Sequence, residues 1–267
     1  MTKEIENVSA SRDFIKSLEK GLNVIQTFSE ENPVLSVAEI AEMTGYSRPT
    51  VRRILLTLTA LGFAKEKNGR YMLTARVLSL GYSYLSSQNI WNVATSHMED
   101  MVKQTKESAS ISVLDQDEIV YVARVPTERI MSITLNIGSR LPAYATSMGK
   151  VLIAYLPASE REKYLENLRL KQLTEKTKAN ITDLREELDQ IVKQGWALAD
   201  EELEEGVRSI AVPIFNSRNE AYAAVNCSAN AGRVSKKRMI EEFLPVLKDT
   251  ASLISRDLSH YQQSHML

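Results

Sequence analysis

Hydrophobic residues recur every three or four positions in the first part of the chain, which is the spacing of one face of a helix. The pattern predicts a first helix over residues 14–28. A second, short helix is expected to begin at Ser36, because Ser36 and Glu39 have the spacing of a capping box, in which a hydroxyl and a carboxylate satisfy each other's backbone amides. Gly45 should end this helix, since glycine adopts a positive φ without a Cβ clash.

A third helix is expected over residues 47–60, and its two sides differ in chemistry. Most of its apolar side chains, from Val51 to Leu58, gather on one side, whereas Arg52 and Arg53 lie on the other. Two short helices joined by a tight glycine turn, the second carrying exposed arginines, are typical of a helix-turn-helix motif, whose second helix fits the major groove of B-DNA. Because the proline after Arg48 disfavours helical geometry there, Arg48 is expected to contact a phosphate rather than a base.

A β-hairpin is expected to follow the third helix. Two short strand-like runs, residues 63–65 and 70–73, flank Asn68-Gly69, which is the strongest short hairpin pattern and suits a type I′ turn. Each feature alone is weak evidence, because helix pairs and solvated basic hairpins are common. Their order over residues 13–75 indicates a winged helix-turn-helix domain. The residues expected to contact DNA are Ser47, Arg48, Thr50, Arg52, Arg53, Lys65, Lys67 and Arg70.

The distribution of charge agrees with a nucleic-acid contact. The 267-residue chain has a net charge of -1, but the segment from Tyr46 to Arg76 contains seven basic residues and one acid, a local charge of +6. The remainder therefore carries about -7, because -1 minus +6 is -7. A compact basic segment on an acidic protein fits phosphate binding, with a solvated basic surface as the alternative.

Residues 76–88 continue as a helix with an apolar stripe that includes Leu80 and Tyr84. Two interpretations of this linker helix stay open, packing within the chain and packing against a second copy. Palindromic DNA is read by proteins with two-fold symmetry, so the second interpretation would make the stripe part of a dimer.

Residues 89–259 show another pattern, in which short apolar runs and amphipathic segments follow one another, and residues 260–267 form a tail. Strands adjacent in sequence and clustered helices predict an α+β domain with a mainly antiparallel sheet. A sheet covered by helices can enclose a small-molecule pocket. Strands are expected over residues 109–114, 119–125, 131–135, 207–215 and 221–228, and helices over residues 91–107, 146–156, 160–168, 182–194 and 236–259.

The composition excludes several classes of protein. With 43% hydrophobic and 25% charged residues, the chain has the composition of an ordinary globular protein. No segment is apolar over the roughly 20 residues that span a bilayer, and the N-terminus lacks the apolar region of a signal peptide, so we expect a cytoplasmic protein without membrane contact. One cysteine and three histidines, two of them in the tail, do not suit a zinc site, and we expect neither a metal nor a cofactor.

No set of residues indicates catalysis. Cys227 lies in an apolar strand, where a free cysteine is usually a small core residue, and His97 is far away in the sequence. The acidic run over residues 200–205 is most simply a solvated loop. The basic winged helix followed by a pocket-forming domain favours a ligand-responsive transcription regulator that is not an enzyme. The alternative is a small-molecule-binding enzyme that carries a DNA-binding domain.

Several segments carry a family resemblance. Residues 35–55 with 61–63, and residues 195–216, which read GWALADEELEEGVRSIAVPIFN, resemble the helix-turn-helix and the effector-domain signature of the IclR family of bacterial transcription regulators. Residues 119–126 and 138–150 resemble the PcaR, PcaU and PobR branch, whose members respond to protocatechuate, 4-hydroxybenzoate or β-ketoadipate and control the breakdown of aromatic acids. The resemblance implies a winged helix, a linker helix and a GAF-like effector domain, in a homodimer or dimer of dimers on a palindromic operator.

The resemblance also implies where a small organic acid effector binds, and it leaves RNA polymerase open as a further partner. Tyr144 stands where many members have histidine, and Ala199 stands where the signature usually has a carboxylate or serine. The missing carboxylate would suit a different, anionic or larger ligand. Arg124 and Arg140 either pair with an effector carboxylate or form ion pairs within the protein. The candidate effector contacts are Arg124, Ile130, Ile133, Arg140, Tyr144, Ser147, Met148, Ser209, Asn226 and Ser228.

Overall fold

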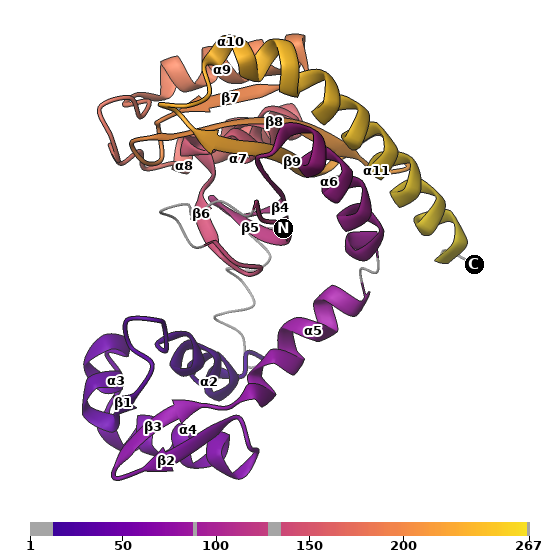
Figure 1. Ribbon diagram of the computed structural model, residues 1–267. Coiled ribbons are helices and arrows are strands. Elements are labelled where there is room, and N and C mark those ends of the chain that lie inside the picture. Colours follow the sequence, from indigo (N-terminus) through magenta and orange to yellow (C-terminus); the bar gives the residue numbers. More distant parts are fainter. Residues whose placement is uncertain (1–12, 88–89, 128–134, 266–267) are drawn as a thin grey trace. The chain divides into compact units, whose positions relative to one another are not determined.

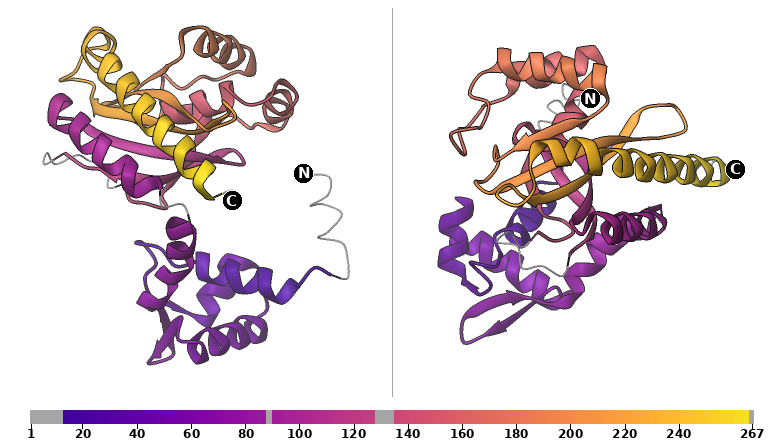
Figure 2. Two further views of the ribbon diagram at one scale, coloured as in Figure 1. Left: turned by 90° about the vertical axis from the view of Figure 1, so that its right-hand side faces the viewer. Right: turned by 45° about the horizontal axis from the view of Figure 1, so that its top comes forward.

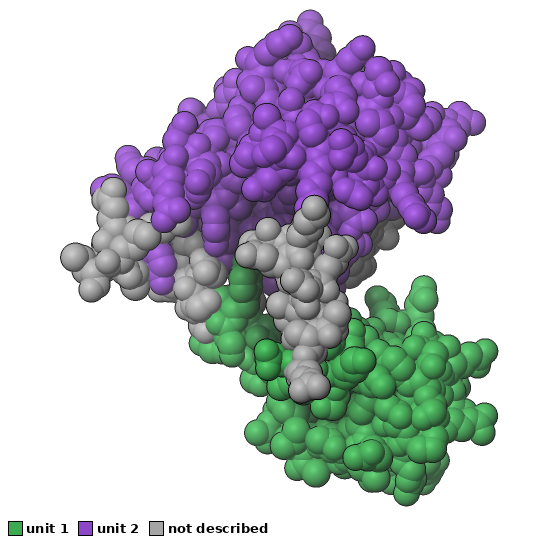
Figure 3. Space-filling model, turned by 180° about the vertical axis from the view of Figure 1, so that it is seen from behind, with its two compact units in different colours: residues 1–86 green, residues 87–267 purple. Residues whose placement is uncertain are grey.

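The computed structural model describes residues 13–87, 90–127 and 135–265. These residues belong to two compact units, which Figure 3 colours separately. Unit 1 comprises residues 1–86 and unit 2 comprises residues 87–267. Each unit has a hydrophobic core of its own.

Unit 1 is built from short helices and a small sheet around an apolar core. Val24, Ile40, Val51 and Leu55 are fully buried in this core. The strand order is β1-β3-β2 with antiparallel neighbours, which is the arrangement of a winged helix-turn-helix. In chain order the elements are α2 (Lys16–Gln26), β1 (Leu35–Ser36), α3 (Val37–Thr44), α4 (Arg48–Ala60), β2 (Ala64–Lys67) and β3 (Arg70–Leu73).

The predicted capping box at the start of α3 is confirmed. The Ser36 amide donates to Glu39 Oε2 over 2.6 Å, and the Glu39 amide donates to Ser36 Oγ over 3.3 Å. The hydrogen bond from the Ser36 amide holds the pKa of the Glu39 carboxyl below its ordinary value. At the other end of α3, Gly45 adopts a φ of 71°, as the turn requires.

The predicted hairpin is confirmed as well. Asn68 and Gly69 have φ values of 55° and 75°, the positive pair that a type I′ turn requires. The Gly69 amide also donates to Glu66 Oε1 over 2.5 Å, which fixes the turn. The linker helix follows as a 3-10 turn, η1 (Ala75–Val77), and then α5 (Leu78–Ser87).

Unit 2 is an α+β domain, as predicted. Among the described residues its antiparallel sheet has the strand order β6-β5-β4-β9-β8-β7. The prediction missed β6 and β7, because strands of three or four residues show too little alternation to be recognised. Residues 131–134 of another expected strand lie outside the described residues, and Leu135 belongs to no strand. The strands are β4 (Ser108–Asp115), β5 (Glu118–Val125), β6 (Arg140–Pro142), β7 (Ala197–Asp200), β8 (Val207–Phe215) and β9 (Ala221–Asn230).

Helices cover both faces of this sheet. They are α6 (Ile90–Thr105), η2 (Ala143–Ala145), α7 (Ser147–Ala154), α8 (Ala158–Asn167), α9 (Ile181–Gln194), α10 (Lys236–Arg238), the π-helical turn η3 (Met239–Phe243) and α11 (Leu244–His265). Figures 1 and 2 show α6 and α11 side by side on one face, with α7 against the other. In the described part of the chain, no helix is long and apolar enough to cross a membrane.

Helix α7 lies unusually close to the segment before it. A Cβ atom on Gly149 would lie 2.1 Å from the carbonyl oxygen of Ala143, so only glycine fits at this position of the helix. Thr146 caps α7 by accepting from the Gly149 amide over 3.1 Å. This contact fixes the N-terminus of α7 above the sheet, next to the cavity described below.

Candidate DNA-binding surface and ligand cavity

The exposed side of α4 is the candidate DNA-reading surface. Ser47 caps the helix, because its Oγ accepts from the Thr50 amide over 3.4 Å and lies 2.9 Å from Thr50 Oγ1. Val51 and Leu55 are buried in the core, which leaves the arginines of the opposite side in solvent. Arg48, Arg52 and Arg53 are all exposed.

These arginines are free to meet a partner. No ion pair joins Arg48, Arg52 or Arg53 to another described residue. The same holds for the exposed lysines Lys65 and Lys67 on the hairpin. An uncompensated basic surface on a helix and an adjacent wing fits the phosphate backbone of DNA.

Arg70 is placed differently from the two wing lysines. Its Nη2 donates to the carbonyl oxygen of Val34 over 3.0 Å and to Glu39 Oε1 over 3.1 Å. Arg70 therefore joins the wing to the start of α3, and about half of its side chain stays exposed. A phosphate contact of Arg70 remains a prediction.

Unit 2 encloses a small cavity between the sheet and the N-terminus of α7. Its volume of about 40 Å³ exceeds the roughly 10–15 Å³ that one water molecule needs. Its polar lining residues are Ser108, Ser110, Tyr121, Arg124, Thr146, Ser209, Asn226 and Ser228, and its apolar lining residues are Leu135, Ala145, Ala199, Leu203 and Val207.

The strand register explains why short polar side chains form the floor of the cavity. Ser209 on β8 pairs with Ser228 on β9, which pairs with Ser108 on β4. In the next row, Asn226 pairs with Ser110, whose other neighbour is Arg124. Residues opposite one another on neighbouring strands share a face, so these short polar side chains form one continuous floor.

Four of the predicted effector contacts line this cavity, namely Arg124, Ser209, Asn226 and Ser228. Ser147 lies directly behind them, because its Oγ is 2.8 Å from Ser209 Oγ.

Other predicted effector contacts do not line the cavity. Met148 is fully buried, and its sulfur accepts from Ser112 Oγ over 3.3 Å. The Tyr144 hydroxyl donates to the carbonyl oxygen of Lys171 over 2.8 Å and accepts from the Lys171 amide over 3.1 Å. Tyr144 therefore holds the backbone at residue 171. Ile130 and Ile133 lie outside the described residues.

Arg140 forms ion pairs within the protein, one of its two predicted roles. Its Nε lies 2.6 Å from Glu118 Oε2, and its Nη2 lies 2.7 Å from Asp115 Oδ2. The hydrogen bond to Glu118 raises the pKa of the Arg140 guanidinium. Glu118 is on the neighbouring strand β5 and Asp115 is paired with Glu118 on β4, so Arg140 reaches across two strands, and an effector contact by Arg140 stays a prediction.

Sequence reasoning missed Ser108, Ser110, Tyr121 and Thr146. One pattern could have found the first two, since serines alternate with apolar residues at 108, 110 and 112 in an otherwise apolar strand. Burial raises the pKa of Tyr121 to about 12, although the nearby charge of Arg124 acts in the opposite direction. Tyr121 is thus a neutral hydroxyl at neutral pH.

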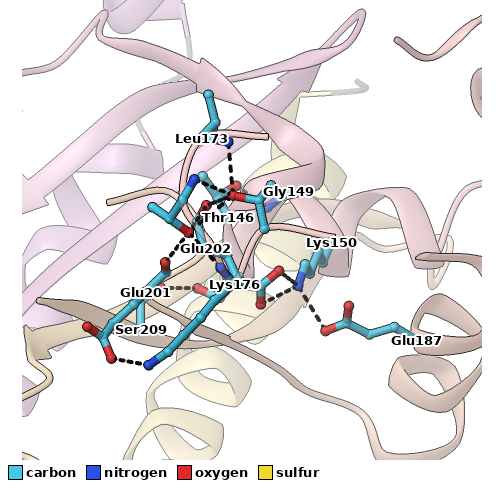
Figure 4. Close-up of polar contacts among 12 residues, drawn as sticks. Thr146, Gly149, Lys150, Leu173, Lys176, Glu187, Glu201, Glu202 and Ser209 are labelled. Carbon is cyan, nitrogen blue, oxygen red and sulfur yellow. Dashed lines mark hydrogen bonds and ion pairs between the residues drawn. The ribbon is translucent and has the colours of Figure 1, made fainter. Parts of the chain in front are cut away.

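A buried polar network fixes the loop that carries Leu203, one wall of the cavity (Figure 4). Thr177 Oγ1 donates to the Glu202 carbonyl oxygen over 2.6 Å, and Thr174 Oγ1 donates to that of Glu201 over 2.7 Å. The Glu202 carboxylate accepts from Lys150 of α7. Burial raises the pKa of Glu202, and the Lys150 charge opposes this shift.

Cys227 and His97 lie on different elements of unit 2, β9 and α6. Cys227 is fully buried on β9, and burial raises the pKa of its thiol to about 12. His97 Nε2 lies 2.8 Å from Asp257 Oδ2 on α11. A thiol with this pKa carries almost no thiolate at neutral pH.

A winged helix-turn-helix with an uncompensated basic surface, followed by a domain with an enclosed polar cavity, defines a class of protein, the DNA-binding transcription regulators with a ligand-binding domain. Comparison with known families identifies the particular group. The model described as "Bacterial transcriptional regulator IclR C-terminal" matches residues 82–256, and the "IclR helix-turn-helix domain" matches residues 17–67. The chain belongs to the IclR family of bacterial transcription regulators.

Within this family, the chain is similar to several regulators of aromatic-acid metabolism. The chain is 40% identical to the Pca regulon regulatory protein of Pseudomonas putida, over 97% of this chain and 88% of that protein. It is 38% identical to the p-hydroxybenzoate hydroxylase transcriptional activator of Acinetobacter baylyi, over 91% of both chains. It also resembles a double mutant of the inducer-binding domain of PobR from Acinetobacter, solved with 3-hydroxybenzoic acid, at 36% identity and a TM-score of 0.58 over 62% of this chain and 97% of that chain.

Proposed function

We propose that this regulator binds a small aromatic acid in the cavity of unit 2 and controls genes for the breakdown of aromatic acids. The observation that carries the proposal is the guanidinium of Arg124, which forms no ion pair with a described residue, in a cavity with a serine and asparagine floor. A double mutant of the inducer-binding domain of PobR, 36% identical to this chain, was solved with such an acid, 3-hydroxybenzoic acid. The 38% identical activator is named for p-hydroxybenzoate hydroxylase, an enzyme of aromatic-acid metabolism.

Different lining residues suit the carboxylate, the hydroxyl groups and the ring of such a ligand. Arg124 offers a planar donor pair for a carboxylate. Asn226 and the neighbouring serine hydroxyls offer donors and acceptors for ring hydroxyl groups. Leu203 and Val207 offer apolar contact for the ring itself. Apolar contact together with directed polar groups that fix the orientation of the ligand is the usual form of a small-molecule site.

Isothermal titration and thermal shift with benzoate, 4-hydroxybenzoate, protocatechuate and β-ketoadipate test the proposal. A ligand at 100 times its dissociation constant should add about 2.7 kcal/mol to the free energy of unfolding. The variant Arg124→Met should lose most of this gain, whereas Arg218→Met, on the exposed turn between β8 and β9, should keep it. Absence of binding by the whole panel would contradict the proposal. Chromatography of the ligand after incubation distinguishes an enzyme, which would consume it.

We also propose that two copies of the chain bind a palindromic operator as a homodimer, or as a dimer of dimers. Leu18, Leu22, Leu78 and Tyr82 expose apolar surface on α2 and α5, which a second copy could cover. In this arrangement Arg52 and Arg53 read bases, and Lys67 contacts phosphates. Because the target is chromosomal DNA, we place the protein in the cytoplasm. RNA polymerase is a further proposed partner at promoters under positive control.

Analytical ultracentrifugation and footprinting on the promoter regions flanking the gene test this arrangement. A protected site with two half-sites one helical turn apart, about 34–36 Å, is expected for a dimer. A monomer at micromolar concentration together with a single protected half-site would contradict it. The variant Leu18→Lys should shift the sedimentation coefficient towards the monomer, and Lys248→Ala, exposed on α11, should not.

A further inference from the structure

A β-bulge brings Tyr121 and Arg124 to the same face of β5. In a regular strand, residues three positions apart point to opposite faces of the sheet. Here Ala123 pairs with Ile111 while Tyr121 pairs with the next residue, Ser112, so Val122 is an extra residue without a partner on β4. Because of this extra residue, the side chains of Tyr121 and Arg124 point to the same face of the sheet. Both therefore line the cavity.

Backbone hydrogen bonds also hold the bulge at the edge of β5 that faces away from β4. The Tyr121 amide donates to the carbonyl oxygen of Ser139 over 3.0 Å, and the Gly138 amide donates to that of Tyr121 over 2.8 Å. Gly138 has a φ of 90°, which its turn requires and other residues rarely adopt. The orientation of Tyr121 is thus fixed by backbone hydrogen bonds on both edges of β5.

The two side chains are complementary donors. Arg124 forms no ion pair with a described residue, and no acidic side chain lines the cavity in the described part of the chain. Tyr121 is 4% exposed and keeps its hydroxyl proton at neutral pH. The described residues thus give the cavity a cation and a neutral hydroxyl donor but no carboxylate to accept from them. We therefore expect the ligand to supply an anionic acceptor.

We propose that the bulge at Val122 makes Tyr121 and Arg124 joint readers of the ligand's carboxylate. Arg124 donates to both carboxylate oxygens, and the Tyr121 hydroxyl donates to a remaining lone pair of one of them, since an ionised carboxylate offers about four acceptor positions. This inference rests on the proposed function, because it assigns the carboxylate of the same ligand. It makes Tyr121 a specificity-determining residue that no motif in the sequence marks.

The proposal separates the carboxylate from the ring hydroxyl of the ligand. If Tyr121 binds the carboxylate, its removal weakens benzoate and 4-hydroxybenzoate equally. If it binds the ring hydroxyl, only 4-hydroxybenzoate is affected. A hydrogen bond to a charged group is lost at roughly a tenfold or larger cost in the dissociation constant.

The experiment measures both dissociation constants by isothermal titration on the full-length protein. Tyr121→Phe should raise both at least about tenfold. Tyr164→Phe is the matched control, because Tyr164 is on α8, its buried hydroxyl has no partner among the described residues, and it does not line the cavity. It should leave both constants within about twofold. Circular dichroism melts of both variants check that they are folded.

A double-mutant cycle with Arg124→Lys supplies the second readout. Because both residues hold one carboxylate, the losses from Tyr121→Phe and Arg124→Lys should not add up in the double variant. Unchanged binding by Tyr121→Phe, a loss confined to 4-hydroxybenzoate, or an equal loss in Tyr164→Phe would each overturn the inference while the proposed function stands. Failure of the wild-type protein to bind either acid would overturn both.

Discussion

Lys150 and Glu202 meet inside unit 2, where the ammonium of Lys150 lies 2.6 Å from each carboxylate oxygen of Glu202. The Lys150 side chain is 0% exposed and the Glu202 side chain is 8% exposed. A second carboxylate, that of Glu187, lies 2.9 Å from the same nitrogen. The pair ties α7 to the loop that carries Leu203, and so it connects two walls of the cavity.

Glu202→Gln should lower the free energy of unfolding by about 3–5 kcal/mol, because removal of one partner leaves a buried charge poorly compensated. Glu187→Gln should cost less, since its side chain is 22% exposed. Urea denaturation measures both. As a control, Asp100→Asn breaks an exposed pair with Lys103 and should stay within about 1 kcal/mol of the wild type. Equal losses in all three variants would contradict this account.

Gly149→Ala should destabilise unit 2 by about 1–3 kcal/mol or more, because the new methyl group would overlap the Ala143 backbone. Gly21→Ala is the opposite case. Gly21 lies inside α2 and a Cβ there meets nothing within 4 Å, so this variant should gain about 0.5–1 kcal/mol. Chemical denaturation of the two variants compares them directly. A fully stable Gly149→Ala protein would show that η2 and α7 are not packed as described.

Arg53→Ala should reduce operator affinity by about 1–3 kcal/mol and lower the ratio of specific to random binding. Lys67→Ala should instead weaken all sequences alike and reduce the slope of the salt dependence by about one. Fluorescence anisotropy at several salt concentrations distinguishes the two effects. If Arg53→Ala left the ratio of specific to random binding unchanged, its role as a base reader would be wrong.

Asp200 makes the stability of unit 2 depend on pH in the acid range. Burial alone would raise its pKa, but hydrogen bonds from Lys236 and Arg208 prevail and lower it below the ordinary value of 3.8. The stabilisation is therefore complete above pH 3.8 and is lost as the pH falls through the lower pKa of the folded protein.

Thermal denaturation at a series of pH values checks this sign. Asp200→Asn should be less stable than the wild type at neutral pH but should lose less stability as the pH falls below the ordinary value of 3.8, because one depressed pKa is gone. Asp100→Asn, whose parent side chain is 70% exposed, should follow the wild-type curve. Parallel curves for Asp200→Asn and the wild type would contradict the prediction.

Local interactions made much of unit 1 predictable. The capping box joins Ser36 to Glu39, and the turn at Asn68-Gly69 depends on the φ values of those two residues alone. The buried side of α4 follows from helical periodicity, since Val51, Leu55 and Leu58 recur at three and four residues. Each of these features is decided within about one helical turn or one hairpin of sequence.

The positions of the arginines show where sequence reasoning ended. Arg70 was expected at a phosphate, yet its partner in the fold is Glu39 at the start of α3. Arg140 pairs with Glu118 because β6 lies beside β5, and with Asp115 because Asp115 is opposite Glu118 on β4. No spacing rule connects such partners, since strand pairing and element packing bring them together.

The sequence by itself determined the order of the longer elements, the basic helix-turn-helix and the family, because these depend on local hydrogen bonding, hydrophobic periodicity and the identity of residues. The tertiary structure alone decided which side chains face the cavity. A shift of one residue in strand register turns every following side chain to the other face, and the bulge at Val122 is such a shift. For this reason Tyr121 lines the cavity beside Arg124. The bulge depends on how β4 pairs with β5, and the sequence of neither strand alone predicts it.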